Sequence, residues 1–316
     1  MACNILAIVQ ARMGSKRFPG KVLKKIDGRS LIEILLKRLS SSKRIDDIIL
    51  ATTDNSQDDV LADDVKNMGF QVFRGSTDDV LNRYYKAAMI YKPKTIIRIT
   101  GDCPLIDPEL VDEVIYFFED NKLDYATLGD PPTFPDGLDT EVFSMKTLEI
   151  CAEKSVLEFD REHVTPFMRE SKLFKVGNFS NDVDYSSERW TVDEPEDFIV
   201  IKNIIRHFNK DITFNWRDVI SLTKSHKQYF EKNKNIMRNE GEKMNSGQKL
   251  WKRAKKIIPG GNMLLSKRSE MFLPDLWPSY FSKAKGCHVW DLDGNKLIDM
   301  SIMGIGTNIL GYGNRE

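Results

Sequence analysis

Apolar runs without polar alternation recur along the first hundred residues, and segments with helical spacing separate them. Unbroken apolar runs of this length are typical of strands buried on both faces of a parallel sheet. Such strands are expected at residues 5–9, 47–52 and 95–99, with a shorter one at 70–73. Helices are expected at residues 30–39, at 57–68 and from a cap at Ser76 or Thr77 to about 91. This alternation predicts an α/β fold with a mostly parallel sheet and helices on both faces.

The pattern is less regular beyond residue 100, and it changes again near the C-terminal end. Further elements are expected as helices at 109–118, 148–156, 198–208 and 216–222 and a strand at 139–143. Residues 226–248 are highly polar with little periodicity, as in a linker. Residues 249–316 contain one helix, a hairpin with an Asp-Gly turn at 286–295 and a glycine-rich stretch at 304–313.

These differences divide the chain into three parts. So few core segments after the linker would be marginal as a domain. We therefore expect a domain at 1–225, a linker at 226–248 and a small, incomplete C-terminal piece at 249–316.

The composition excludes several classes of protein. With 47 basic and 47 acidic residues among 316, the chain has no net charge, so binding to nucleic acid or to an anionic membrane is not expected. Its four cysteines have no C-x-x-C spacing, which argues against a disulfide framework and a zinc site. The first apolar run is too short for a signal peptide, and none reaches the roughly 18 residues of a membrane span. A cytoplasmic protein is expected.

A basic loop follows the first strand. It contains two glycines and four cationic side chains: Gly14, Gly20, Arg12, Lys16, Arg17 and Lys21. Open α/β sheets bind ligands at the carboxyl ends of their strands, and glycine turns let backbone amides approach a phosphate. A P-loop is excluded because five residues separate the glycines where it needs four, and no G-x-G-x-x-G motif is present. We expect a phosphate site; the alternative is an ordinary basic surface loop.

Asp102 follows the strand at 95–99 and is expected at the same sheet edge as the basic loop. A carboxylate there would repel a triphosphate unless a divalent cation lies between them, and Mg²⁺ takes one or two carboxylates together with phosphate oxygens. Asp193, at the start of an acidic helix, is a candidate second carboxylate. The alternatives are structural: Asp102 would cap the turn before Pro104, and Asp193 would cap its helix.

Five motifs occur in the first 225 residues. They are QARMGS with PGK (10–21), FRG with DVLNRY (73–84), TGDCPL (100–105), PDGLDTEVF (135–143) and TVDEPED (191–197). In this order they resemble the motifs of the cytidylyltransferases grouped with the spore-coat polysaccharide enzyme and, more distantly, with the CMP-Kdo and CMP-acylneuraminate synthetases. The resemblance implies a nucleotide-diphospho-sugar transferase type of α/β fold, often dimeric, that uses CTP and Mg²⁺.

The resemblance also implies roles for individual residues. Catalysis would fall to Arg12, Lys21 and Asp102, and Mg²⁺ would be bound by Asp102 and Asp193. The nucleotide would be bound by Gln10, Ala11, Arg12, Met13, Gly14, Ser15, Lys21, Arg74 and Asp79. The acceptor would be bound by Asp136, Asp139, Glu141 and His163. Turn chemistry explains the acidic residues of the 135–143 motif almost as well, and a lone histidine is more often a packed or surface residue.

Three further motifs occur near the C-terminal end. They are RAKKIIPGG (253–261), VWDLDGN (289–295) and IDM with GIG (298–306). They resemble the amino-terminal end of a class III, glutamate-1-semialdehyde type aminotransferase. The lysine that carries pyridoxal phosphate in that family is expected beyond residue 316, so pyridoxal phosphate would belong to a full-length aminotransferase domain and not to this chain.

These observations predict an enzyme that transfers CMP from CTP to a sugar acid or a related small acceptor and releases pyrophosphate. Its product would be a precursor of surface polysaccharide or glycoconjugate, and a homodimer is expected. One alternative is a CDP-forming enzyme that acts on a phosphorylated amino-alcohol or sugar. A glycosyltransferase of the same fold needs a D-x-D pair, which Cys103-Pro104 after Asp102 disfavours. A non-catalytic nucleotide-binding module is the third alternative.

Overall fold

The chain forms two compact units in a computed structural model, Met1–Asn235 and Ile236–Glu316. The structure describes residues 3–236, 238, 246–262, 268–271, 277–300 and 310–313. Each unit is described by itself.

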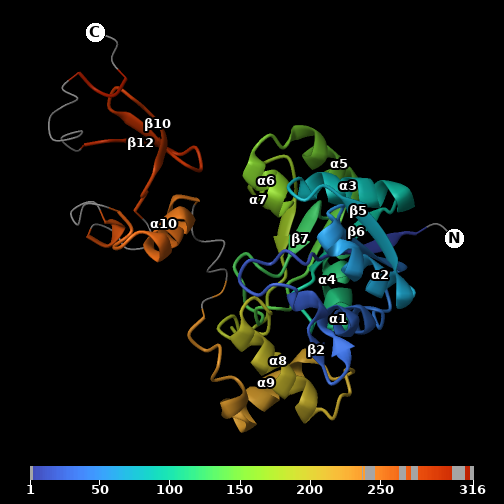
Figure 1. Cartoon of the computed structure of the whole chain (residues 1–316). Helices are drawn as coiled ribbons and strands as arrows, with labels where there is room; N and C mark the ends of the chain where they lie inside the picture. The colour runs from blue at the N-terminus through green and yellow to red at the C-terminus, as the bar shows by residue number, and fades with distance from the viewer. Residues whose placement is uncertain are drawn as a thin grey trace. The chain divides into compact units, whose positions relative to one another are not determined.

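The described part of the first unit is built on a seven-stranded sheet with the order β5-β4-β1-β6-β8-β7-β9 (Figure 1). In that order the strands are Gln71–Gly75, Asp47–Thr53, Ile5–Gln10, Thr95–Thr100, Glu141–Ser144, Tyr125–Thr127 and Val176–Asn178. The first four are parallel, and β8 pairs antiparallel with both β6 and β7. A two-stranded ribbon, β2 (Lys25–Ile26) and β3 (Arg29–Ser30), follows the 3-10 turn η1 (Lys21–Leu23).

Both faces of the sheet are covered by helices, and alternate residues of β1 enter two separate apolar clusters. Ile5, Ala7 and Val9 pack with residues from α1, α2, α4, α8 and α9, whereas Leu6 and Ile8 pack with residues from α3, α5 and α7. The helices of the first cluster are Leu31–Leu39, Asp59–Asn67, Pro108–Asp120, Pro195–His207 and Trp216–Ser225. Those on the other face are α3 (Val80–Tyr91), α5 (Met145–Lys154), α6 (Glu158–His163) and α7 (Pro166–Glu170). The prediction of a mostly parallel sheet with helices on both faces is therefore confirmed.

Two predicted helix caps are wrong by one to three residues. Helix α3 begins at Val80 and is capped by Asp79, whose side chain accepts a hydrogen bond from the amide of Asn82. Neither Ser76 nor Thr77 caps it. Helix α8 is capped by Glu194, which together with Asp197 forms a capping box. Asp193 is thereby left outside the helix, with its carboxylate available for other contacts.

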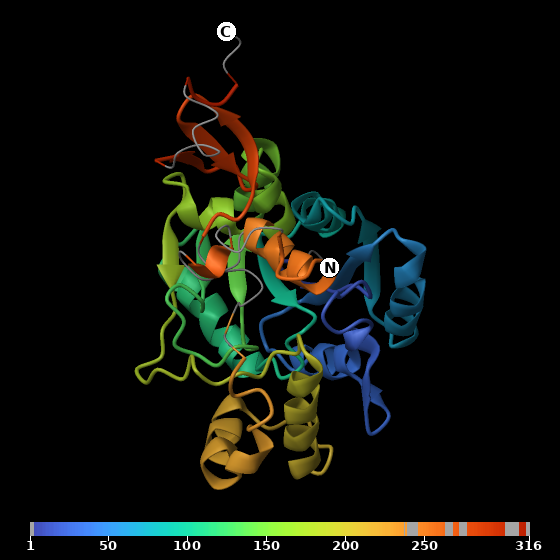
Figure 2. The ribbon, with the colours of Figure 1, turned by 60° about the vertical axis from the view of Figure 1, so that its left-hand side comes forward.

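The first unit continues past the domain end expected at residue 225. Helices α8 and α9 lie side by side in both views (Figures 1 and 2), and the 3-10 turn η3 (Lys227–Tyr229) packs on them. The amide of Asn203 on α8 donates to the carbonyl of Tyr229, and Asn233 beyond this turn is buried. Residues 226–235, expected to belong to a polar linker, thus pack on the first unit.

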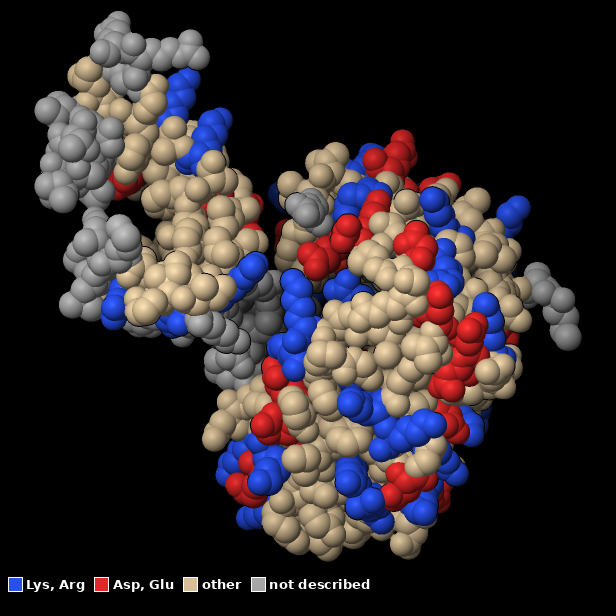
Figure 3. All heavy atoms as spheres, in the orientation of Figure 1, with Lys and Arg blue, Asp and Glu red and all other residues tan. Residues whose placement is uncertain are grey.

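Basic and acidic side chains are interspersed on the face of the first unit that Figure 3 shows, in keeping with the absence of net charge. In the second unit, α10 (Ser246–Ile257) precedes the turn η5 (Ser269–Met271) and a three-stranded antiparallel sheet. Its strands are β10 (Phe281–Lys285), β11 (His288–Asp291) and β12 (Lys296–Ile298). Most of the glycine-rich stretch at 304–313 lies outside the described residues. Among the helices of the described ranges, none is long and apolar enough to cross a membrane.

Candidate active site

The basic loop after β1 is held by a buried carboxylate. Asp58, which is 2% exposed, accepts a hydrogen bond of 2.6 Å from the amide of Met13 and a further one from the Thr53 hydroxyl. The amides of Ser15 and Gly20 both donate to the carbonyl of Met13, at 2.9 and 3.1 Å. The backbone expected to contact a phosphate is therefore folded upon itself, and the amides of Met13 and Ser15 already have protein acceptors.

The end of β1 lies directly against the turn that carries Asp102. The amide of Gly101 donates to the carbonyl of Gln10 at 2.7 Å, and a Cβ built on Gly101 would lie 2.6 Å from the Cβ of Ala11. No side chain fits in that space, so glycine is required for this close approach. Ala11 is 4% exposed and forms this packing contact, whereas the side chain of Arg12 beside it is exposed. Asp102 is thus at the sheet edge where the sequence predicts it.

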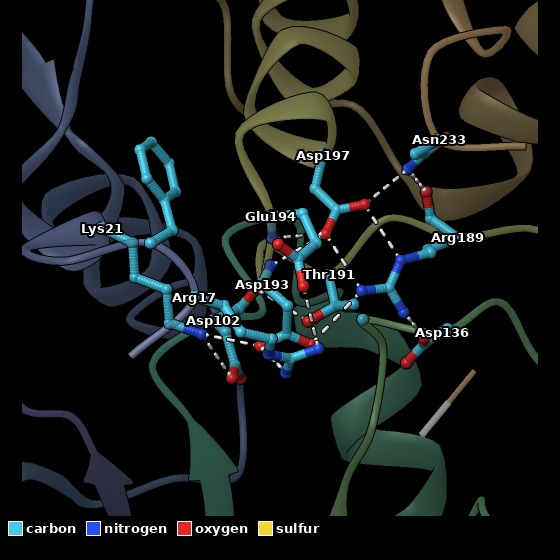
Figure 4. A network of polar contacts seen from close by, with 12 residues as sticks. Arg17, Lys21, Asp102, Asp136, Arg189, Thr191, Asp193, Glu194, Asp197 and Asn233 are labelled. Atoms are coloured by element: carbon cyan, nitrogen blue, oxygen red, sulfur yellow. Dashed lines mark hydrogen bonds and ion pairs between the residues drawn. The ribbon is translucent and has the colours of Figure 1, made fainter. Parts of the chain in front are cut away.

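Lys21 lies between the two predicted metal ligands. Its Nζ is 3.0 Å from Oδ2 of Asp102 and 2.9 Å from Oδ1 of Asp193, and Lys21 is 8% exposed (Figure 4). Asp102 and Asp193 are distant in sequence, yet hydrogen bonds to the Asp102 backbone bring their turns together. The Val192 amide and the Thr191 hydroxyl both donate to the carbonyl of Asp102, at 2.8 and 3.2 Å. Three residues predicted from separate motifs are therefore in direct contact.

The charges of this group stabilise one another. Burial alone would raise the pKa of Asp102, but the Lys21 ammonium and hydrogen bonds to its carboxylate lower it from 3.8 to about 2. Burial likewise acts to lower the pKa of Lys21, and the two carboxylates outweigh this effect and raise that pKa above its ordinary value. Lys21 and Asp102 are therefore both charged at neutral pH.

The residues present fit a divalent cation. In the network of Figure 4, the cations Arg17, Lys21 and Arg189 contact a larger number of carboxylates: Asp102, Asp136, Asp193, Glu194 and Asp197. The network thus has an excess of negative charge. Within the described ranges, no group of three or more His, Cys, Asp or Glu side chains gathers as a ready metal site. A pair of carboxylates suits Mg²⁺, which completes its coordination with water and phosphate oxygens.

Removing the Lys21 ammonium is expected to reveal the affinity of Asp102 and Asp193 for Mg²⁺. In a Lys21→Met variant the ammonium between the two carboxylates would be gone, so Mg²⁺ would no longer compete with it for that position. At a magnesium concentration roughly ten times the dissociation constant, the melting temperature should rise by about 3–5 °C. Differential scanning fluorimetry measures this, with Lys25→Met, an exposed lysine on β2, as the control. A Lys21→Met protein that magnesium leaves unchanged would contradict the fit.

Acid is expected to remove the stability that Asp102 contributes. Because its pKa is lower in the folded protein than its ordinary 3.8, the contribution is fully present above that value and is lost as the pH falls toward about 2. Denaturant unfolding measures the free energy of unfolding at about pH 5 and about pH 2.5. This free energy should fall less between the two pH values in an Asp102→Asn variant than in the wild type. Equal losses in the two proteins would argue against the charge pair.

Two residues predicted to bind the nucleotide have structural contacts. The guanidinium of Arg74 donates to the carbonyls of Thr53 and Asn55, at 2.9 and 2.8 Å, and pairs with Asp59 at 2.6 Å. It thereby fastens β5 to the turn after β4. Asp79 caps α3 and pairs with Arg161 at 2.7 Å. None of these contacts joins either residue to Lys21, Asp102 or Asp193, so their role with the nucleotide stays a prediction.

The residues predicted to bind the acceptor are not gathered in one group by their described contacts. Glu141 is buried: Arg98 and Tyr125 hydrogen-bond to its carboxylate, and the Thr165 hydroxyl donates to it at 2.7 Å. Asp136 pairs with Arg189 at 2.8 Å. Asp139 accepts a hydrogen bond from the amide of Gly137 at 3.1 Å, which is turn chemistry as the alternative proposed.

His163 ends α6, where the backbone is strained. Its ring lies 4.5 Å from that of Phe159. Val164, which follows, has a φ of 72°, rare for a β-branched residue, and the amide of Thr165 donates to the carbonyl of His163 across this tight turn at 2.9 Å. The turn sets Thr165, the N-cap of α7, against Glu141, so this hydrogen bond joins the start of α7 to the start of β8.

Six labelled residues of the network were not among the predicted site residues: Arg17, Arg189, Thr191, Glu194, Asp197 and Asn233 (Figure 4). Arg17 pairs with Asp193 at 3.0 Å, Arg189 with Asp136 and Asp197, and Asn233 hydrogen-bonds to Asp197. Arg17 was visible as one of the loop cations. No local pattern indicates Arg189 or Asn233, because their partners come from other segments of the chain.

A mostly parallel α/β sheet with a basic loop and paired carboxylates at its carboxyl edge fits a nucleotidyltransferase, and the family match shows that the chain is an enzyme of that class. Comparison with family models identifies it further: residues 6–240 match the cytidylyltransferase model, and the chain belongs to that family.

Known proteins resemble the chain over most of the first unit's length. The spore coat polysaccharide biosynthesis protein SpsF of Bacillus subtilis is 37% identical over 207 residues, 63% of this chain and 85% of that protein. An 8-amino-3,8-dideoxy-manno-octulosonate cytidylyltransferase of Shewanella frigidimarina is 30% identical over 180 residues, 55% of this chain and 71% of that protein. The solved structure of a cytidylyltransferase from Leptospira borgpetersenii matches with a TM-score of 0.69 and 32% identity, covering 75% of this chain and 100% of that one.

Proposed function

We propose that this cytidylyltransferase transfers CMP from CTP to a sugar acid and releases pyrophosphate. The observation that carries the proposal is the position of Lys21, whose ammonium lies 3.0 and 2.9 Å from the carboxylates of Asp102 and Asp193. The exposed Arg12 and the basic loop lie at the same sheet edge. Cations for a triphosphate and carboxylates for a metal are thus side by side.

The chemistry needs positioning and charge neutralisation rather than covalent help. The acceptor oxygen attacks the α-phosphorus of CTP in line with the leaving pyrophosphate. Arg12 and Lys21 would hold the triphosphate. Asp102 and Asp193 would hold Mg²⁺, which when bound supplies a Lewis acid for the developing negative charge. Lys21 now contacts both carboxylates, so in this proposal its ammonium would exchange them for the triphosphate.

Two observations support the choice of acceptor: the substrate for which a relative is named, and the sequence of the C-terminal piece. The relative from Shewanella is named for an 8-amino sugar acid. The C-terminal piece, residues 249–316, is proposed to be the start of an aminotransferase domain, which would suit a pathway with an aminated acceptor. Asp136, Asp139, Glu141 and His163 would form the acceptor side. A homodimer in the cytoplasm completes the proposal.

A pyrophosphate-release assay tests the proposal. The full chain is incubated with Mg²⁺, each of the four common nucleoside triphosphates and a panel of acceptors: sugar acids with and without an amino group, and phosphorylated amino-alcohols and sugars. The expected result is release with CTP and a sugar acid. Release only with a phosphorylated acceptor would identify a CDP-forming enzyme instead, and CTP binding without any release would favour a non-catalytic module.

A further inference from the structure

Arg189 connects Asp193 to two other carboxylates. Its guanidinium forms a bidentate pair with Asp197, Nε to Oδ1 at 2.9 Å and Nη2 to Oδ2 at 3.0 Å. Nη1 donates to Asp136 at 2.8 Å, and Nη2 reaches Oδ2 of Asp193 at 3.3 Å (Figure 4). The side chain of Arg189 is 6% exposed. One buried cation therefore fixes the side chain of Asp193 from the side opposite Lys21.

Asp197 holds the backbone of the same turn. Its Oδ2 accepts hydrogen bonds of 2.9 Å from the amides of both Asp193 and Glu194. Asp197 is fully buried, so these bonds and the pair with Arg189 form in a place that water does not reach. Asp193 is thus held twice, at its amide by Asp197 and at its carboxylate by Arg189.

Asn233 completes this arrangement from the end of the first unit. Its Nδ2 donates to Oδ1 of Asp197 at 2.9 Å and to the carbonyl of Arg189 at 3.0 Å, and the residue is 3% exposed. Both hydrogens of one amide group are therefore used on the two residues that hold Asp193. The first unit ends at Asn235, shortly after this buried residue.

We infer that Asn233, which follows α9 and the turn η3, is a positioning residue for Asp193 and supports the active site from outside it. The inference rests on the proposed function, in which Asp193 is a metal ligand. Asn233 touches neither substrate nor metal; it orients Asp197 and Arg189, and these orient the carboxylate. Replacing a residue that orients a metal ligand by hydrogen bonds typically lowers metal affinity or activity by about 10- to 100-fold.

The test compares two asparagines of this segment in the full chain. Asn233→Ala removes both hydrogen bonds, and Asn235→Ala, an exposed neighbour, is the matched control. CTP binding is measured by calorimetry without acceptor, once with Mg²⁺ and once with EDTA. We expect about tenfold weaker binding of CTP by Asn233→Ala with Mg²⁺ and an unchanged affinity in EDTA. A second variant, Asn233→Leu, keeps the side-chain volume and gives the answer if Asn233→Ala unfolds.

Amide hydrogen exchange of the metal-free protein gives a second, independent readout. The amides of Asp193 and Glu194, which donate to Asp197, should exchange faster in Asn233→Ala and at the wild-type rate in Asn235→Ala. Equal losses of CTP affinity with and without Mg²⁺, or unchanged exchange at these two amides, would overturn the inference. If the wild type itself binds no CTP, the proposed function fails, while the exchange comparison still decides whether Asn233 orders this turn.

Discussion

Turnover with CTP is expected to fall at least ~100-fold when Asp102 is replaced by alanine, the scale seen when other electrostatic contacts to a transition state are deleted. Two effects add. The variant would lose one carboxylate of the proposed metal site, and Lys21 would lose one of its two charged partners, now at 3.0 Å. The remaining Asp193 would hold the ammonium alone, so both the metal and the lysine would be misplaced.

Initial rates of pyrophosphate release with saturating CTP and Mg²⁺ measure this loss. Asp182→Ala, which removes an exposed aspartate, is the control and should retain wild-type turnover. Circular dichroism and thermal unfolding establish that the variant is folded. An Asp102→Ala protein that is folded and turns over at a near-native rate would refute the assignment of this site.

Replacement of Arg98 by methionine is expected to lower the free energy of unfolding by about 3–5 kcal/mol, as when one partner of a buried ion pair is removed. Arg98 on β6 pairs with Glu141 on β8, and their side chains are 15% and 11% exposed. Burial alone would raise the pKa of Glu141, but Arg98 and hydrogen bonds from Tyr125 and Thr165 hold it below its ordinary value. Without Arg98 a charged carboxylate would be left in the sheet.

Chemical denaturation at neutral pH measures the effect. In the double variant Arg98→Met, Glu141→Leu no charge is buried, so it should recover much of the lost stability. Arg44→Met is the matched control, because Arg44 pairs with Glu119 at the surface and such pairs contribute about 0–1 kcal/mol. If Arg98→Met and Arg44→Met lost equal stability, the pair between β6 and β8 would not be the strong contact that the structure indicates.

The sequence determined the class of fold and the position of the reactive edge. Unbroken apolar runs at β1, β4 and β6 indicate buried parallel strands, and polar residues that follow such strands must lie at one edge of the sheet. Lys21 and Asp102 are expected at that edge, and the structure brings both into contact with Asp193, the candidate second carboxylate, through the Lys21 ammonium. Periodicity carries this information because it records which faces of each element are buried.

The contacts that join distant segments were decided by the tertiary structure alone. Nothing in the local pattern around Arg74 or Glu141 shows that their side chains are engaged by Asp59 and Arg98. In the same way, Asn233 stands in a polar segment that reads as a linker, yet its amide is buried against Asp197. Pairing of this kind depends on strand order and on the path of each loop, so a side chain's partner is set by segments far away in the sequence.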